Sequence, residues 1–184
     1  QLRYGAAANE GDAVAIAAGA ELGGSGGVAM FQNSGLGNAV NPLTSLTWTF
    51  RIPILLIVTW RGEPGGHADE PQHELMGQIT PRMLELMNIP WALFPDSEAA
   101  IAPTLDAAVA SMQKTQRPYA LVMRKGSVAD SALGGDLRPP TSRQPVPVAR
   151  KPAVARRQAM LAAIRAADSG HDVLVATTGY MGRE

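Results

Sequence analysis

Residues 28–43 read VAMFQNSGLGNAVNPL, and this stretch decides the fold class. The short apolar run 28–32 has the length and composition of a buried strand. The glycine-containing turn 33–38 follows it, and apolar residues then recur at helical spacing as far as Phe50. We expect Pro42 in the first turn of that helix, where proline is tolerated. The stretch therefore predicts a strand, a turn and a helix, which begin a βαβ unit.

The same alternation continues on both sides of this stretch. The other elements predicted in the first 126 residues are helices at 12–22, at 80–87 and from Ser97 to Met112, and strands at 54–60, 91–94 and 119–123. The run 54–60 is continuously apolar, as in a strand buried on both faces. Alternating strands and helices predict an α/β fold of three layers, a parallel sheet with helices on both faces.

The chain changes character after residue 126. Residues 127–152 are rich in Pro, Gly and Ser and lack apolar periodicity, so we expect a linker. A helix at 153–167 and a strand at 172–178 then predict the start of a second α/β domain, truncated at Glu184. Because the sequence also has no initiator Met, we expect it to be a piece of a longer protein, with residues 1–126 as an incomplete first domain.

The composition restricts the classes of function. The 16 basic and 16 acidic residues leave no net charge, so no global field draws the chain onto nucleic acid or an anionic membrane. The absence of cysteine excludes disulfides and thiolate chemistry. Since no segment has the pattern of a signal peptide or the length of a membrane span, we expect a cytoplasmic protein.

The turn at Gly35 is one candidate site. In open α/β sheets ligands bind at the carboxyl ends of strands, and a turn that opens a helix presents backbone N–H groups there. As a dinucleotide fingerprint the turn is incomplete, because Val40 occupies the third small position and no acid follows about 20 residues on. A turn that only lets the helix pack closely on the sheet is one alternative. A non-catalytic module that binds a nucleotide or an interaction partner is another.

Glu10 has two interpretations on the residues alone. It lies between Asn9 and Gly11, directly ahead of a run of small apolar residues. An acid near a helix N-terminus complements the helix dipole and contributes about 0.3–1 kcal/mol. A carboxylate with a perturbed pKa at a functional site is rarer. The spacing leaves both interpretations open.

The polar loop 61–73 is longer than the usual connection, and such loops often carry function. It contains His67 and His73, whose separation of six residues matches no standard metal-binding spacing. We therefore predict no metal ligand in these 184 residues.

Four segments resemble the pyrimidine-binding domain of thiamine-diphosphate-dependent decarboxylases. They occur in the same order and at matching separations within residues 5–126, and 173–184 is similar to the opening of the family's diphosphate-binding domain. The segments are ANEG at 8–11, FQNSGLGNAVNPL at 31–43, WRGEPG at 60–65 and DEPQH at 69–73. The resemblance implies the thiamine-diphosphate-binding fold.

The resemblance also implies roles for particular residues. Glu10 would hydrogen-bond a ring nitrogen of the cofactor's aminopyrimidine and favour the imino form that removes the thiazolium C2 proton. A dry, partly buried site would favour the acid form of Glu10 and a strong hydrogen bond. The residues implied to line the pyrimidine pocket are Asn33, Gly35, Gly37 and Asn38. Those implied to hold a distal anion of the substrate or to relay protons are Arg61, Gln72 and His73.

The nearest members of this family act on 3-phosphonopyruvate or 3-sulfopyruvate. The resemblance therefore implies decarboxylation of 3-phosphonopyruvate to phosphonoacetaldehyde and carbon dioxide, with 3-sulfopyruvate or another 2-oxo acid as the alternative. It implies Mg²⁺ as a second cofactor, bound by a Gly-Asp-Gly motif and a downstream Asn in the second domain. It also implies a homo-oligomer with the active site between chains, so that this piece alone would be inactive.

Overall fold

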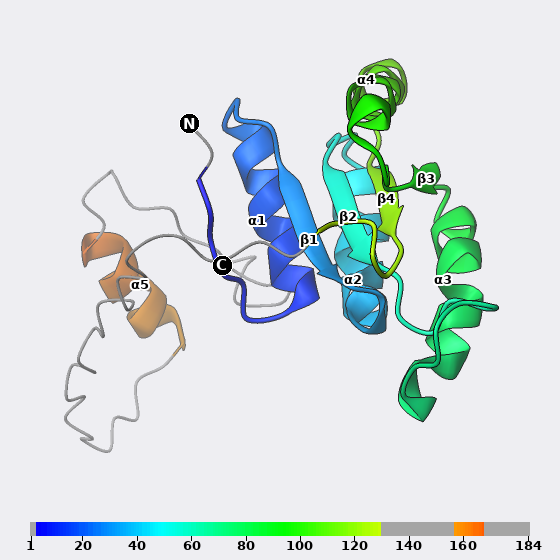
Figure 1. The fold of residues 1–184 in the computed structure, drawn as a ribbon. Coiled ribbons are helices and arrows are strands. Elements are labelled where there is room, and N and C mark those ends of the chain that lie inside the picture. Colours follow the sequence, from blue (N-terminus) through cyan, green and yellow to red (C-terminus); the bar gives the residue numbers. More distant parts are fainter. Residues whose placement is uncertain (1–2, 130–156, 168–184) are drawn as a thin grey trace, which may run out of the picture. The chain divides into compact units, whose positions relative to one another are not determined.

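The computed structural model describes residues 3–129 and 157–167 (Figure 1). They belong to two compact units, and each is described by itself. Helix α5 (Arg157–Ala167) in the second unit confirms the described part of the helix predicted over 153–167. Most of the linker predicted over 127–152, and all of the strand predicted over 172–178, lie outside the described residues. The domain boundaries therefore stay a prediction.

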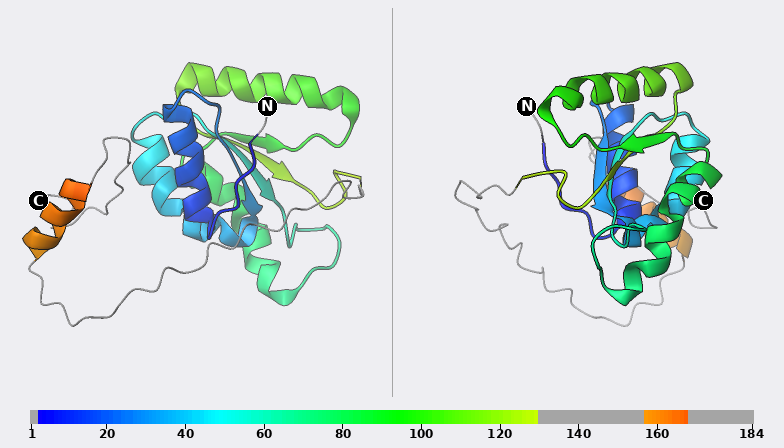
Figure 2. Two further views of the ribbon diagram at one scale, coloured as in Figure 1. Left: turned by 90° about the vertical axis from the view of Figure 1, so that its left-hand side faces the viewer. Right: turned by 45° about the vertical axis from the view of Figure 1, so that its right-hand side comes forward.

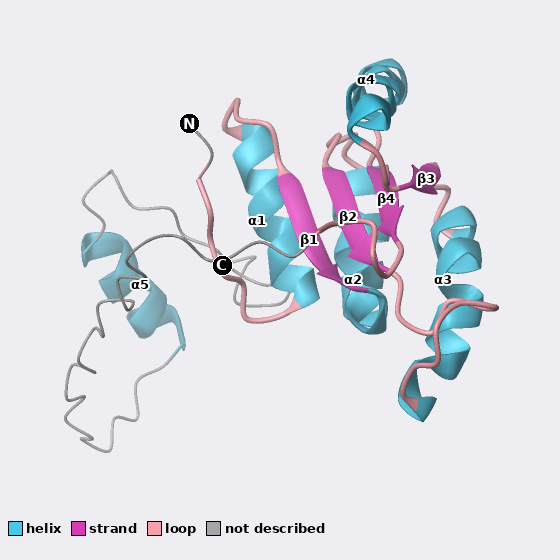
Figure 3. Cartoon of the chain, viewed as in Figure 1, coloured by secondary structure: helices cyan, strands magenta, loops and turns pink. Residues whose placement is uncertain are grey.

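A parallel sheet forms the centre of the first unit (Figure 3). Its order is β1-β2-β4-β3, and all neighbouring strands are parallel. The strands are β1 (Val28–Gln32), β2 (Leu55–Thr59), β3 (Trp91–Leu93) and β4 (Tyr119–Met123). Val28 pairs with Leu55, and Leu55 with Tyr119, so the strands β1, β2 and β4 are in step. Their carboxyl ends consequently meet at one edge of the sheet.

Helices cover both faces of this sheet (Figure 2). Helix α1 contacts α2, η2 and β1 on one face, and α3 follows on that face. Helix α4 packs against β4 on the other face, as right-handed crossovers require when the strand order reverses after β3. The helices are α1 (Glu10–Leu22), α2 (Leu36–Asn41), the π-helical η2 (Pro42–Trp48), α3 (Glu74–Leu86) and α4 (Glu98–Thr115), with short 3₁₀ turns η1 (Asn33–Gly35) and η3 (Pro71–His73). The predicted three-layer α/β fold is confirmed.

The main core lies between the sheet and α1, α2 and α3. Alternate strand residues such as Ala29, Leu56 and Val58 are buried there. On the opposite face of β1, Val28 and Met30 are 51% and 64% exposed. The expectation that 54–60 is buried on both faces was wrong, because burial alternates along β2 and α4 packs mainly on β4.

Two helices begin earlier than the sequence predicts. Helix α1 begins at Glu10 rather than Asp12, because the Asn9 side chain is the N-cap and accepts a hydrogen bond from the Asp12 N–H at 3.0 Å. Helix α3 begins at Glu74 rather than residue 80, and Pro81 lies inside it. Gly77 and Pro81, two residues that are unfavourable inside a helix, interrupt the pattern from which the start of α3 would be predicted.

The segment after β1 also differs from the expectation. Helix α2 starts at Leu36, directly after the turn η1, so Pro42 follows the end of α2 and is the first residue of η2. Proline lacks the N–H that an α-helix needs at this position, and the chain continues as the π-helical η2. Ser97 is the N-cap of α4 as predicted, but its side chain makes no capping hydrogen bond. In the described part of the chain, no helix is both long enough and apolar enough to cross a membrane.

Candidate active site

The first turn of α1 meets the turn that follows β1. The Glu10 carboxylate accepts a hydrogen bond of 2.8 Å from the Asn38 side-chain amide. Gly35 lies against the Glu10 side chain so closely that a Cβ there would be 2.1 Å from Glu10 Cδ. Only glycine leaves room for this contact, since real Cβ contacts are never that short. The structure therefore brings together Glu10, Gly35 and Asn38 from the set predicted by sequence.

The ionisation of Glu10 differs from the expectation of a dry site. The hydrogen bond from Asn38 lowers the pKa of Glu10, and a hydrogen bond from the Glu10 backbone N–H lowers it further. Burial acts in the opposite direction but is the smaller effect, because the side chain is only half-buried in this chain. The carboxylate form, rather than the acid form, is thus favoured here.

Asn33 and Gly37 lie on either side of this contact in very different environments. Asn33 is fully buried, and its amide donates to the Arg61 carbonyl at 2.9 Å and to the Thr80 hydroxyl at 3.0 Å. Its side-chain oxygen accepts from the Arg61 N–H at 3.1 Å. Asn33 therefore cross-links the ends of β1 and β2 to α3. Gly37 is exposed, and a Cβ there would meet nothing within 4 Å.

The loop after β2 is organised around Asp69. Its carboxylate accepts from Arg61 Nε at 2.8 and 3.1 Å and also from Arg61 Nη2. The backbone N–H groups of Gly62 and Glu70 each donate to it at 2.8 Å. The hydrogen bonds from Arg61 hold the pKa of Asp69 well below its usual range. The two backbone donors lower this pKa further. Asp69 is therefore an anion at neutral pH.

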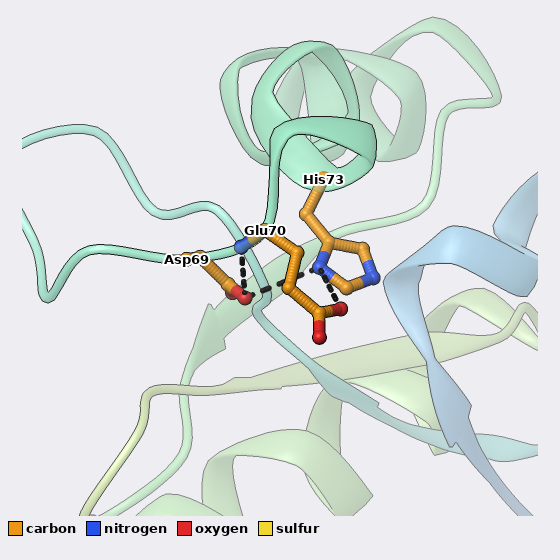
Figure 4. A group of neighbouring side chains, drawn as sticks. All are labelled: Asp69, Glu70 and His73. Atoms are coloured by element: carbon orange, nitrogen blue, oxygen red, sulfur yellow. Dashed lines mark hydrogen bonds and ion pairs between the residues drawn. The ribbon is translucent and has the colours of Figure 1, made fainter.

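His73 is the buried member of the same loop. Its side chain is 8% exposed, and Nδ1 lies 3.2 Å from an Asp69 carboxylate oxygen and 3.8 Å from Glu70. Figure 4 shows the second ring nitrogen turned away from both carboxylates. Two glycines permit this packing: a Cβ on Gly62 would lie 2.2 Å from the His73 carbonyl, and one on Gly77 would lie 1.7 Å from the Gly62 carbonyl.

The three predicted substrate residues thus gather in one loop, where each is tied to an acid. Gln72 is exposed and donates to Glu70 at 2.7 Å. The family resemblance implies roles for Arg61, Gln72 and His73, but none for the acids Asp69 and Glu70. The signal was present in the DEPQH segment, because an acid four residues before a histidine at a helix start can reach its ring.

Asp69, Glu70 and His73 each offer a ligand atom within 4.8 Å of the others. The Arg61 guanidinium already lies against both carboxylates, in direct contact with Asp69 and 3.6 Å from Glu70. Because this cation compensates their charge, we assign no metal to the cluster.

A hollow of about 500 Å³ lies beyond the ends of β2 and β4. Trp60, Arg61, Arg124 and Lys125 are among its lining residues. Arg124 pairs with Glu63 at 2.7 Å. The hollow lies beside the turn that follows β4. A second hollow of about 450 Å³ borders the loop at Asp69 and Glu70.

Comparison with known proteins agrees with this arrangement, although no family model matches the chain. Phosphonopyruvate decarboxylase of Streptomyces viridochromogenes is 43% identical over 99% of the chain and 46% of its own length. Phosphonopyruvate decarboxylase of Streptomyces hygroscopicus is 45% identical over 77% of the chain and 34% of its own length. Sulfopyruvate decarboxylase subunit alpha of Methanocaldococcus jannaschii is 34% identical over 63% of the chain and 67% of its own length.

The fold is an open parallel α/β domain. Its candidate ligand-binding groups lie in the turn after β1 and the loop after β2, at the carboxyl ends of these strands. The chain belongs to the family of phosphonopyruvate and sulfopyruvate decarboxylases. The family predicted from the four sequence segments is thereby confirmed. The chain spans less than half the length of the two Streptomyces relatives.

Proposed function

We propose that the complete protein is a thiamine-diphosphate-dependent decarboxylase that converts 3-phosphonopyruvate to phosphonoacetaldehyde and carbon dioxide. The observation that carries the proposal is the identity of 43% and 45% to two proteins named phosphonopyruvate decarboxylase. This chain would supply the groups that bind and activate the cofactor's aminopyrimidine.

The residues at the turn after β1 fit an aminopyrimidine ring. The carboxylate of Glu10 has a second oxygen besides the one that Asn38 binds, and each carboxylate oxygen accepts more than one hydrogen bond, so it can pair with a ring nitrogen. Gly35 lets the Glu10 side chain lie against the turn, and the backbone at Gly37 is open, since a Cβ there would have no neighbour within 4 Å. When bound, thiamine diphosphate supplies the electron sink into which the bond to carbon dioxide can break.

Glu10 and His73 would move or hold protons in this reaction. A carboxylate that shares a proton with a ring nitrogen gains from exclusion of water, so we propose that a second chain covers the half-buried Glu10. His73 would act as a proton relay near the substrate, with Gln72 beside it. Mg²⁺ and the diphosphate would bind to a part of the protein outside the residues described.

The proposed substrate preference is tested in an assay that contains the complete protein, thiamine diphosphate and Mg²⁺. Carbon dioxide release is measured from 3-phosphonopyruvate and 3-sulfopyruvate side by side. We expect the higher kcat/KM for the phosphonate, in line with the higher identity to its decarboxylases. A higher kcat/KM for 3-sulfopyruvate would assign the protein to the alternative substrate, and no release from either would refute the proposed activity.

A nucleotide-binding module without catalysis is the alternative from another class, favoured by the turn at Gly35. Thermal unfolding separates the two, because a ligand that binds the native state raises Tm. We expect thiamine diphosphate with Mg²⁺ to raise the Tm of the complete protein and NAD to leave it unchanged. We further propose a cytoplasmic homo-oligomer, and sedimentation of the complete protein tests its assembly.

A further inference from the structure

We infer that Asp69 is a positioning residue for His73, and that Arg61 serves to hold Asp69 rather than the distal anion of the substrate. This inference rests on the proposed function, in which His73 relays a proton. It assigns a role to Arg61 and Asp69, which are joined to each other by several hydrogen bonds in the loop after β2.

The Asp69 carboxylate is fixed from several directions at once. Arg61 donates from Nε and Nη2, and the backbone N–H groups of Gly62 and Glu70 donate from the two ends of the loop. Charge-assisted paired hydrogen bonds of this kind are strong and directional. Asp69 lies at the surface, and these contacts leave only 18% of its side chain exposed. The carboxylate is therefore a fixed acceptor at a defined place.

This fixed acceptor selects one tautomer of His73. Because Asp69 stays ionised, the ring nitrogen beside it, Nδ1, must carry the hydrogen and donate it at 3.2 Å. Nε2 then holds the free lone pair. The side chain is 8% exposed, so its surroundings restrict rotation of the ring. Figure 4 shows Nε2 directed away from the two acids.

The proposed reaction consumes one proton, because the bond to carbon dioxide is replaced by a C–H bond. His73 can accept this proton from solvent at Nε2 and donate it to the carbon that has lost carbon dioxide, which regenerates the neutral ring. Nδ1–H stays bound to Asp69 during the transfer, so the ring keeps its orientation. For histidines that bind metals, removal of such a polar partner commonly changes activity by about 10- to 100-fold, and we expect an effect of similar size here.

Arg61 is poorly placed to bind a phosphonate in addition. Two of its nitrogens are engaged by Asp69, and Nη2 also lies 3.6 Å from Glu70. Turning the guanidinium toward a substrate would take from Asp69 its principal donor. Glu70 cannot replace Asp69 as the partner of His73, because it is 3.8 Å from Nδ1 and its side chain is 61% exposed.

The first test is Asp69→Asn in the complete protein with thiamine diphosphate and Mg²⁺. We expect kcat for 3-phosphonopyruvate to fall by about 10- to 100-fold with little change in KM. The matched control is Glu63→Gln, which removes another acid of the same loop that pairs with an arginine, Arg124, at 2.7 Å. The control is expected to keep kcat within about twofold. An unchanged kcat in Asp69→Asn, or a loss confined to KM, would overturn the inference.

The second test asks whether Asp69 acts through His73. Residues that work as a unit show non-additive losses. Asp69→Asn combined with His73→Gln should therefore lose no more kcat than His73→Gln alone. Independent, additive losses in the double variant would refute the positioning role even if each single variant were impaired.

A third measurement covers the case in which Asp69→Asn fails to fold or the wild type proves inactive. The tautomer of His73 is read from ¹⁵N chemical shifts of histidine-labelled wild-type protein, with His73→Gln to assign the signal. We expect the Nδ1–H form, and the Nε2–H form would overturn the inference. An inactive wild type with the expected tautomer would refute the proposed function and leave the arrangement of Asp69 and His73 intact.

Discussion

Three neighbouring residues hold the Glu10 side chain in position. Asn9 caps the helix that begins at Glu10, Gly35 leaves room for its side chain and Asn38 binds its carboxylate. A carboxylate at this position is thus a packed and hydrogen-bonded group, and more than a complement to the helix dipole. Two substitutions test this at the scale of the residue.

Glu10→Gln should abolish most activity of the complete protein. The amide cannot share a proton with a ring nitrogen, and general acid–base groups contribute about 10²- to 10⁴-fold. We expect kcat for carbon dioxide release to fall by about 100-fold or more with a smaller change in KM. Turnover within about twofold of wild type would contradict the role of Glu10.

Gly35→Ala should displace Glu10 without removing it. The new Cβ would lie 2.1 Å from Glu10 Cδ, so the carboxylate must move. We expect kcat to fall as in Glu10→Gln and the affinity for thiamine diphosphate to weaken, both measured by steady-state kinetics. The control is Gly19→Ala in α1, where a Cβ meets nothing within 4 Å. Equal activity of the two variants would show that Gly35 is not needed for the contact.

At the scale of elements, the close approach of α3 to the loop after β2 forms the second half of the candidate site. Gly62 has φ +67°, a left-handed conformation that favours glycine, and its carbonyl lies against Gly77 of α3. Asn33 joins the end of β1 to the same two elements. The loop is therefore held by backbone packing and buried hydrogen bonds as well as by its ion pairs.

Gly77→Ala should destabilise the domain. A Cβ there would lie 1.7 Å from the Gly62 carbonyl, and neither backbone segment can yield easily. Overpacking of this kind costs about 1–3 kcal/mol in the free energy of unfolding, measured by urea denaturation. Gly19→Ala is again the control, and it should be neutral or slightly stabilising because alanine favours helix. Equal stability of the two variants would refute the close packing.

The acid Asp69 should make the stability of this loop dependent on pH. Its pKa is lower in the folded state than in the unfolded chain, so the unfolded state binds more protons between the two values. The stabilisation is complete above the unfolded pKa of about 3.9 and is lost as pH falls toward the folded value. We expect the stability difference between wild type and Asp69→Asn to shrink below about pH 4. A difference independent of pH would contradict the ion pair.

At the scale of the whole molecule, the parallel sheet of the first unit brings the two halves of the candidate site to one edge. The strands β1 and β2 are neighbours in register, so the Glu10 contact after β1 and the Asp69 loop after β2 lie beyond adjacent strand ends. Asn33 connects the two directly through its bonds to Arg61. A parallel arrangement is what makes these distant segments neighbours.

Much of this could be predicted from the sequence. The strand at 28–32 and the turn after it follow from apolar runs and glycine positions, and the four family segments indicate the family that the comparisons confirm. The start of α3 could not be predicted, because Gly77 and Pro81 are unfavourable inside a helix and yet lie within this one. The lowered pKa of Glu10 could not be predicted from the sequence either, because it depends on a hydrogen bond from Asn38, 28 residues away.

The sequence by itself determined the α/β class, the family and the set of polar residues from which a site can be built, because periodicity and motif spacing are local properties of the chain. Only the tertiary structure decided how those residues pair. In it, Arg61 hydrogen-bonds Asp69, Asp69 lies within hydrogen-bond distance of His73, and the buried Asn33 links β1, β2 and α3. Pairing depends on which side chains meet in space, and the packing of α3 against the ends of β1 and β2 settles that.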